Sequence, residues 1–303
     1  MPREVFGSDY SYIAREELLS FEEIDSFVES VLPLGIEKIR LTGGEPLLRR
    51  DFPTLVEMLS RHSVELALTT NGILLEKFAE DLAIAGLDRV TVSLDALDDE
   101  TFQVMTDTDT KVSEVLAGID AAVAAGLGPV KINAVVRKGV NEHAILQLFN
   151  HFQGSGIIVR FIEYMDVGSS NGWQRDEVVT ASEILEILSK EHVLQPVYTD
   201  NSNQVAKLWQ TKDGDKVGII TSISNPFCGD CTRARISSEG QFYTCLFADS
   251  GFDLKSPIRS GADANELREI VQFVWEGRLD RYSELRNEVN RIRLPIEMSH
   301  IGG

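Results

Sequence analysis

Helix-like and strand-like stretches alternate along the first half of the chain. The helix-like stretches are 20–35, 74–86, 112–126 and 142–156, and the strand-like stretches are 37–46, 67–72, 88–96, 129–136 and 157–165. Each helix-like stretch runs into a glycine, as expected of a helix C-cap: Gly35, Gly86, Gly126 and Gly156. Five such repeats predict a parallel α/β sheet or barrel with helices on its outside.

The strand-like stretches alternate between an apolar and a largely polar face. The apolar faces carry Ile39/Leu41, Leu66/Leu68, Val90/Val92/Leu94 and Ile132/Ala134. The other faces carry Arg40/Thr42, Ala67/Thr69/Asn71, Thr91/Ser93/Asp95, Lys131/Asn133 and Phe161/Glu163/Met165. A parallel strand covered on both sides is ordinarily apolar on both faces. Buried polar pairs, such as Lys131 with Asp95, would explain any single strand, but five strands together favour a barrel lumen that holds a polar ligand.

The pattern changes near Val167, where we place a domain boundary. Residues 1–166 form the repeat region and residues 167–303 form a second region. In the second region a helix would begin after Thr180 as its N-cap. A hairpin with its turn at 212–216 then leads into a cysteine-containing segment.

Composition restricts the partners that the protein can have. The 303 residues include 48 acidic and 29 basic side chains, so the formal net charge is −19. This charge argues against sequence-independent binding to nucleic acid or to an anionic membrane. An anionic ligand would therefore need local positive charge. Because no apolar signal segment or membrane span is visible in the sequence, we expect a cytoplasmic protein.

All cysteines of the chain lie in one segment with the spacing C-x2-C-x13-C: Cys228, Cys231 and Cys245. In a reducing compartment such a group is more typical of metal or cluster ligands than of disulfides. A structural zinc site needs a fourth ligand, and none of the five histidines lies inside the segment. A [4Fe–4S] cluster can be held by three thiolates, which leaves one iron open. On spacing alone, zinc and an iron–sulfur cluster are equally good interpretations, and inert thiols are a poorer one.

Two further motifs point to an anionic or amine-bearing ligand. Arg233 and Arg235 share a face if their segment is extended, which suits bidentate binding of phosphate or carboxylate. Surface ion pairs with neighbouring acids are the ordinary alternative. Gly43 and Gly44 follow a strand and allow close approach of a ligand to the backbone, although Gly-Gly is also common in plain turns. Glu45 could accept a hydrogen bond from a ligand amine.

Several stretches together resemble one known family. They are KIRLTGGEPLLRRD (38–51), LALTTNG (66–72), VTVSLDALD (90–98), RFIEYMDVG (160–168), FCGDCTRARISSEGQFYTCLF (227–247) and IGG (301–303). The chain is similar in these stretches to the radical-SAM GTP 3′,8-cyclases of molybdenum cofactor biosynthesis. The resemblance implies an incomplete TIM-like barrel of the radical-SAM type, closed by a C-terminal region that carries an iron–sulfur cluster.

The resemblance also implies roles for particular residues. Cluster ligands would be Cys228, Cys231 and Cys245; GTP contacts would be Arg40, Thr69, Lys131, Arg233 and Arg235; S-adenosylmethionine contacts would be Gly44, Ser93 and Met165. Gly302 and Gly303 would thread into the active site. The implied activity is that of a lyase, which converts GTP to (8S)-3′,8-cyclo-7,8-dihydroguanosine 5′-triphosphate by S-adenosylmethionine radical chemistry. The product would pass to a cyclic pyranopterin monophosphate synthase, and the protein would be a monomer or homodimer.

One feature departs from the family pattern. The family carries a second [4Fe–4S] cluster on an N-terminal C-x3-C-x2-C motif, and the ligands of that cluster are absent here. The chain begins just past the place of that motif, and the preceding first strand is also missing. We therefore expect a truncated chain that is inactive in cleaving S-adenosylmethionine. The alternatives are a non-catalytic remnant that binds GTP and one cluster, and a zinc-stabilised aldolase-like barrel.

Overall fold

The computed structural model describes residues 13–168, 170–198, 205–226, 228–229, 231–286 and 296–302. The strands are β1 Lys38–Leu41, β2 Glu65–Thr70, β3 Arg89–Ser93, β4 Lys131–Val136, β5 Ile158–Glu163, β6 Gln195–Val197, β7 Lys207–Gln210, β8 Lys216–Ile220, β9 Arg235–Ile236, β10 Gln241–Tyr243 and β11 Phe252–Asp253. The α-helices are α1 Phe21–Val31, α2 Phe52–Leu59, α3 Leu75–Ile84, α4 Asp99–Thr106, α5 Val112–Ala124, α6 Ala144–His151, α7 Ala181–Leu188, α8 Lys255–Arg259, α9 Ala264–Glu276, α10 Tyr282–Leu285 and α11 Met298–Ile301. Short 3-10 helices are η1 Arg15–Glu17, η2 Leu32–Leu34, η3 Pro46–Leu48 and η4 Arg175–Glu177.

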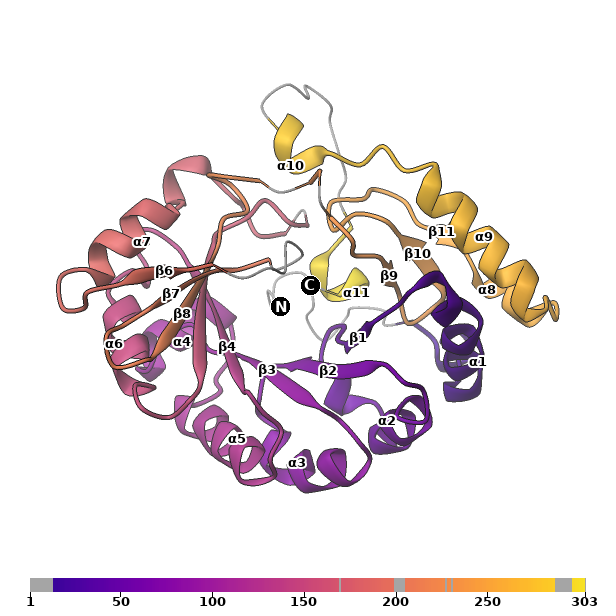
Figure 1. The fold of residues 1–303 in the computed structure, drawn as a ribbon, viewed down its shortest axis with the longest axis horizontal. Helices are drawn as coiled ribbons and strands as arrows, with labels where there is room; N and C mark the ends of the chain where they lie inside the picture. The colour runs from indigo at the N-terminus through magenta and orange to yellow at the C-terminus, as the bar shows by residue number, and fades with distance from the viewer. Residues whose placement is uncertain are drawn as a thin grey trace.

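The larger sheet has eight strands in the order β1-β2-β3-β4-β5-β8-β7-β6, and the smaller sheet has the order β11-β10-β9. β1 to β5 run parallel, each paired with the next strand in sequence. Figure 1 shows the large sheet curved into an open ring with helices on its outer side, and α11 inside the ring. Among the described residues β1 and β6 end the sheet without pairing to each other, so the predicted incomplete barrel is confirmed.

Helix starts follow the capping rules that the sequence suggests. Ser20, Thr180 and Asp263 precede α1, α7 and α9. The side chain of each accepts the backbone N–H of the glutamate three residues later, and the side chain of that glutamate accepts the backbone N–H of the capping residue. The prediction for Thr180 is thus confirmed. Nowhere in the described residues does a helix have the length and apolar composition needed to cross a bilayer.

Three of the four predicted glycine caps are confirmed. Gly35, Gly86 and Gly126 have φ of 87°, 97° and 79°, the left-handed conformation that ends a helix. Gly156 also has a positive φ of 77°, but α6 ends earlier, with Phe152 as its C-cap. The prediction fails there because a turn at 152–155 separates the helix from this glycine.

The outward faces of β1 to β4 pack under the helices, as the alternation predicts. Leu68, Val92 and Ile132 are fully buried. Leu68 lies opposite Val90 of β3, and Val92 lies opposite Ile132 of β4. The helices contribute further members of this core, among them Leu55, Leu59, Leu75, Leu82, Val115 and Ile119. β2 to β4 therefore bury one face completely, β1 buries it in part, and the other face is left for the lumen.

The face predicted for β5 is wrong. Phe161 packs in the outer core, in register with Ala134 of β4. Arg160 faces the lumen instead, where its guanidinium donates a 3.2 Å hydrogen bond to Thr91 Oγ1. The prediction fails because it carries the alternation through to Met165, beyond Glu163, the last residue of the strand.

The second region continues the large sheet. β8 pairs in parallel with β5, and the predicted hairpin is the antiparallel pair β7–β8. Strand pairing thus crosses the proposed boundary at residue 166, and the division into two domains remains a prediction.

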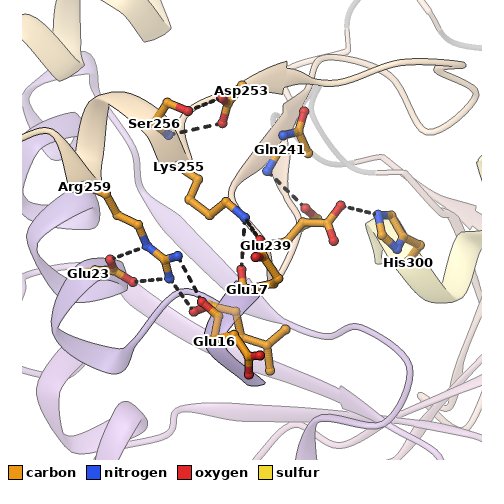
Figure 2. Close-up of polar contacts among 12 residues, drawn as sticks. Glu16, Glu17, Glu23, Glu239, Gln241, Asp253, Lys255, Ser256, Arg259 and His300 are labelled. Atoms are coloured by element: carbon orange, nitrogen blue, oxygen red, sulfur yellow. Dashed lines mark hydrogen bonds and ion pairs between the residues drawn. The ribbon is translucent and has the colours of Figure 1, made fainter. Parts of the chain in front are cut away.

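The small sheet and its helices pack against the start of the repeat region. Phe27 and Val31 of α1 share an apolar cluster with Phe242, Leu254 and Val271. Ion pairs reinforce this contact from the side of α8, as Figure 2 shows. Lys255 pairs with Glu17, and Arg259 Nε donates to Glu23 Oε1 at 2.9 Å. Exposed pairs of this kind add little stability singly, so the buried cluster fixes this arrangement.

Candidate functional site

A group of positively charged side chains lines the lumen of this acidic protein. We refer to them as the lumen cations: Lys38, Arg40, Arg89, Lys131, Arg160, Arg233 and Arg235. The first five project from the inner faces of β1, β3, β4 and β5, and the last two come from the cysteine-containing segment. After burial, repulsion from other members of the group lowers the pKa of Lys38, Arg40, Lys131, Arg160 and Arg235. The strand residues and the segment residues therefore lie close together.

The two lysines of the group titrate well below their ordinary range. Burial first, and then repulsion from the nearby Arg160 and Arg89, lower the pKa of Lys131 to about 8. The pKa of Lys38 also falls to about 8, first through burial and then through Arg89 and Arg40. Burial likewise lowers the pKa of Arg160 to about 10. Without a ligand, the lumen cations therefore destabilise one another.

Arg40 connects the strand cations to the cysteine-containing segment. Its pKa is lowered by burial among barrel atoms, then by Arg233 and by Arg89. Its side chain is nevertheless accessible to solvent, because an open lumen admits water while surrounding the guanidinium with protein. Burial, followed by repulsion from Arg233, lowers the pKa of Arg235 to about 10. The structure thus brings together four of the five residues predicted to contact GTP.

Polar atoms without partners also face the lumen. Thr69 Oγ1, Asn133 Oδ1 and Arg160 Nε are buried and lack a hydrogen-bond partner in the part of the chain that the structure describes. Native structures seldom leave buried polar atoms unsatisfied, and a ligand is one of the ordinary reasons. The internal pair of Lys131 with Asp95 does not form, since Asp95 Oδ1 accepts the backbone N–H of Val135 at 2.8 Å. Among the described residues Lys131 has no ion-pair partner, so a buried polar pair does not explain this lysine, although Arg160 and Thr91 do form such a pair.

Only one described carboxylate forms ion pairs with the lumen cations on the strands. Glu65, the first residue of β2, lies 3.2 Å from Lys38 Nζ and also pairs with Arg89. A single carboxylate cannot neutralise the five cations on the strands, so among the described residues an excess of positive charge remains there. This excess suits a polyanion such as a triphosphate.

Lys38, Arg89 and Arg160 are site residues that the sequence reasoning missed. Lys38 lies two residues before Arg40 and Arg89 two before Thr91, so the alternation already placed both on the inner face. For Arg160 the available signal was Gly218. A Cβ on Gly218 would lie 2.9 Å from Arg160 Cγ, so this glycine makes room for the arginine stem.

The cysteines lie at the edge of the same group. Cys231 N donates to Cys228 O at 3.2 Å in a turn, and Arg233 lies 3.4 Å from Cys231 Sγ. Burial alone would raise the pKa of Cys231, but Arg233 outweighs it, so the pKa lies below the ordinary value. The pKa of Cys245 is raised, mainly by burial and in part by Cys228. Among the described residues no three His, Cys, Asp or Glu side chains converge as ligands of one metal ion.

A neighbouring stretch braces the backbone of this segment. Arg278 donates to the carbonyl of Cys231 at 2.7 Å, and Glu284 accepts the N–H of Gly229 at 3.1 Å. Arg278 also stacks on Trp275, with 3.5 Å from its central carbon to the ring centroid. These contacts fix two of the peptide groups around the first two cysteines.

The opposite end of the lumen is formed where strands end. Gly44, Ser93 and Met165 follow or complete β1, β3 and β5, and Met165 packs beside Val135 on the inner side. No polar contact of the described residues joins the three to one another. Their roles toward S-adenosylmethionine remain predictions. The role of Glu45 toward a ligand amine also remains a prediction.

The carboxylate of Glu45 links two strand ends. It accepts hydrogen bonds from Thr70 Oγ1 and from the backbone N–H groups of Leu47 and Asn71, at 2.8, 3.1 and 2.8 Å. The interpretation as an amine acceptor was based on its place after the glycines. The structure adds that the carboxylate also accepts three hydrogen bonds from the loops it connects.

The segment 296–302 reaches the middle of the site. Arg235 Nε donates to the carbonyl of Gly302 at 2.9 Å. Gly302 has φ of 74°, and a Cβ there would lie 2.6 Å from Thr42 Cγ2. Only glycine fits this position without displacement. Gly303, the other predicted tail residue, lies outside the described residues.

Fold and site together define an open α/β barrel. Its lumen is suited to a polyanion, and three cysteines lie at the edge of the lumen cations. Comparison with known families agrees with this class. The sequence model described as Radical SAM superfamily matches residues 7–152, and the one described as Molybdenum Cofactor Synthesis C matches residues 157–284.

Relatives with curated names are similar over the whole chain. A GTP 3′,8-cyclase of Acidothermus cellulolyticus is 49% identical, and one of Staphylococcus saprophyticus is 46% identical; each alignment covers 100% of this chain and 91% of the relative. This chain therefore belongs to the GTP 3′,8-cyclase family of the radical SAM superfamily. Membership of the superfamily implies a [4Fe–4S] cluster and S-adenosylmethionine as cofactors.

Solved structures support the fold. Streptococcus suis SuiB aligns with a TM-score of 0.58 at 13% identity, over 83% of this chain and 62% of that one. The structure titled native anSMEcpe with bound AdoMet aligns with a TM-score of 0.56 at 19% identity, over 86% and 75%. At this level of identity the likeness concerns the incomplete barrel alone.

Proposed function

We propose that this protein acts as a GTP 3′,8-cyclase and that the lumen cations bind the triphosphate of GTP. The observation that carries the proposal is the accumulation of positively charged side chains, and of buried polar atoms unsatisfied among the described residues, in the lumen of a chain with a net charge of −19. A guanidinium can bind phosphate through two parallel hydrogen bonds. Thr69 and Asn133 offer further polar contacts to the nucleotide.

The three cysteine side chains would hold the cluster next to the nucleotide. Cys228, Cys231 and Cys245 are the proposed ligands, and their electrostatic contacts with one another and with Arg235 support a common site. Three thiolates leave one iron of the cluster open to an atom of the guanine base. Arg233, between the thiols and the lumen, would lie beside both cluster and phosphate. The low pKa of Cys231 favours the thiolate that ligation requires.

S-adenosylmethionine would lie at the end of the lumen formed by Gly44, Ser93 and Met165. When bound, it supplies the one-electron chemistry that removes a hydrogen atom from the ribose. The protein's own residues bind and orient the nucleotide and keep water from the reacting atoms. The product would be a substrate of cyclic pyranopterin monophosphate synthase.

The chain does not contain the thiolates for two clusters. It has three cysteines in total, and once they hold one cluster none is left for another. We therefore derive no step through a second cluster. This count favours a second candidate function, a non-catalytic protein that binds GTP and one cluster. The two candidates differ in one measurement, the formation of 5′-deoxyadenosine with dithionite. Product would support the cyclase, whereas GTP binding without it would support the second candidate.

Calorimetric titration with GTP tests the shared part of both candidates. We expect binding that weakens steeply with salt, because several cations are neutralised at once. Guanosine, which lacks phosphates, should bind at least a hundred-fold more weakly than GTP, as expected when two or more charged contacts are lost. Equal affinity for both would contradict the role of the lumen cations.

Anaerobic reconstitution tests the cluster. We expect about four irons and four sulfides per chain, as for one [4Fe–4S] cluster. Replacing Cys245 by alanine should abolish cluster retention, because two thiolates hold such a cluster poorly. Stoichiometric zinc without iron in anaerobically purified protein would overturn the assignment.

A further inference from the structure

The segment 296–302 is held by polar contacts at both of its ends. Before α11, Glu297 accepts hydrogen bonds from the N–H of Ser170 at 3.0 Å and from its hydroxyl at 2.8 Å. Within α11, His300 Nε2 lies 3.0 Å from Glu239 Oε1, a contact that Figure 2 shows. Gly302 follows His300 by two residues, and its carbonyl accepts the hydrogen bond from Arg235.

The loop at Ser170 is shaped around the Glu297 carboxylate. Gly168 has φ of 76°, and a Cβ there would lie 2.4 Å from Glu297 Oε2. The carboxylate therefore occupies space that any other residue at position 168 would fill. Ser170 follows β5 by a short loop that also contains Met165, so this anchor belongs to the end of the lumen assigned to S-adenosylmethionine.

The second anchor belongs to the phosphate side. Glu239 lies in the turn between β9 and β10, and β9 begins with Arg235. His300 is thus tied to the same short hairpin that presents the arginine. The His300 and Glu239 side chains are 29% and 24% exposed, so water screens their contact less than it would at a fully open surface.

A helix as short as α11 cannot fix its own position. It spans Met298–Ile301, and isolated helices shorter than about 12 residues are marginal in water. Ile301 is buried, but a single apolar side chain does not define an orientation. The anchors on either side of the lumen therefore help to place Gly302 between Arg235 and Thr42, together with the backbone hydrogen bond from Ile296 N to Ala248 O at 3.5 Å.

We propose that Glu297 and His300 form a two-point latch, with Ser170 and Glu239 as their anchors, that holds Gly302 on Arg235 and Thr42. These four are positioning residues: they act on the nucleotide site through Gly302 and Arg235. The inference rests on the proposed function in taking Arg235 as a phosphate ligand. It adds a physical link between the two ends of the lumen, because one short segment is fastened to both.

Hydrogen–deuterium exchange of the intact, ligand-free chain tests the latch. In His300→Ala and in Glu239→Ala, a peptide covering 296–302 should exchange on the order of ten-fold faster, as expected when a charge-assisted contact is lost. Ser170→Ala removes only a hydroxyl and should give a smaller increase. Glu239→Gln keeps an oxygen acceptor for His300 and should restore slow exchange, which a nonspecific loss of stability would not do.

The chain offers a matched control. His62 Nε2 lies 2.9 Å from Asp25 Oδ1, a partly buried pair of the same chemistry between α1 and the end of α2. His62→Ala should leave exchange at 296–302 unchanged. Faster exchange there in His62→Ala, or unchanged exchange in His300→Ala and Glu239→Ala, would overturn the latch.

Calorimetry separates this inference from the proposed function. His300→Ala should weaken GTP binding by about three-fold or more, because Arg235 loses its fixed partner. If the wild-type chain fails to bind GTP while the exchange pattern is as expected, the proposed function fails and the latch remains. If GTP binds and exchange at 296–302 is insensitive to both anchors, the latch is wrong and the proposed function remains.

Discussion

The two ends of the barrel carry charges of opposite sign that are handled in opposite ways. Toward the strand starts and the cysteine-containing segment, the lumen cations repel one another and Glu65 is their one carboxylate partner on the strands. At the strand ends, Glu45 and Glu163 follow or complete β1 and β5, and each accepts at least two backbone N–H groups. Unpaired charge marks a place for a ligand, whereas charge saturated by backbone marks a scaffold.

The difference shows why burial alone does not identify a functional group. Glu163 has no exposed surface and accepts hydrogen bonds from Ala181 N, Ile223 N and Ser224 N, each at 2.8 Å. Arg160 is buried to a similar degree, with its Nε unsatisfied. The carboxylate closes the loops around the second region, and the guanidinium remains available for a ligand. Four changes test this contrast.

The largest effect is expected at the scaffold end. Glu163→Ala leaves three backbone N–H groups without their acceptor and should lower the free energy of unfolding by about 3–5 kcal/mol. Urea denaturation measures the loss. Glu163→Gln keeps one acceptor oxygen and should lose less, and Glu57→Ala, at an exposed site of α2, should change stability by less than about 0.5 kcal/mol. A change as small for Glu163→Ala would contradict the scaffold role.

Arg235 tests the ligand end. Arg235→Ala should weaken GTP binding by roughly ten-fold or more, since a bidentate contact with phosphate contributes about 1.5–3 kcal/mol. Arg235→Lys keeps the charge but not the planar fork, and should recover part of the affinity. Arg61→Ala removes an exposed cation that lies 4.0 Å from Glu57 and should leave the dissociation constant unchanged. An unaltered constant for Arg235→Ala would show that its bond to Gly302 is its whole role.

Lys131 should show opposite effects on binding and on stability. Its pKa of about 8 lies below that of an unfolded lysine, so the unfolded chain binds more protons between about pH 8 and 10.5. Stability of the ligand-free protein should therefore gain from this group as the pH rises through that window, while GTP affinity falls as the ammonium loses its proton. Lys131→Met should weaken GTP binding and stabilise the ligand-free protein.

Two measurements check Lys131. Calorimetry of GTP binding at pH 8, in buffers of different ionisation enthalpy, should show proton uptake in the wild type and less in Lys131→Met. Thermal unfolding of both proteins without GTP compares their stability. A less stable Lys131→Met variant would mean that Lys131 has a structural partner.

The smallest effect is expected from Glu65. Removing its charge by Glu65→Gln frees Lys38 and Arg89 for phosphate and should tighten GTP binding by about two- to five-fold, as for the loss of one partly exposed ion pair. Titration at low and high salt measures the change, which should shrink as salt rises. Weaker GTP binding in Glu65→Gln would show that Glu65 orients the cations rather than competing for them.

The sequence was sufficient for the repeat architecture and for most of the polar lumen. Period-two alternation is local, so Arg40, Thr69 and Lys131 could be placed on the inner face without knowledge of any distant contact. The same rule failed for β5, because the sequence does not show where a strand ends. Because of that one error, the prediction omitted Arg160 from the lumen and wrongly placed Phe161 there.

By itself, the sequence determined the family and the cysteine-containing segment, because these are carried by residue identity and spacing. Only the tertiary structure decided which charged groups are satisfied. The bond of Arg235 to Gly302 joins residues 67 positions apart, and that of Glu297 to Ser170 joins residues 127 apart. Contacts of this kind depend on how packed elements meet in space, and no local pattern encodes them.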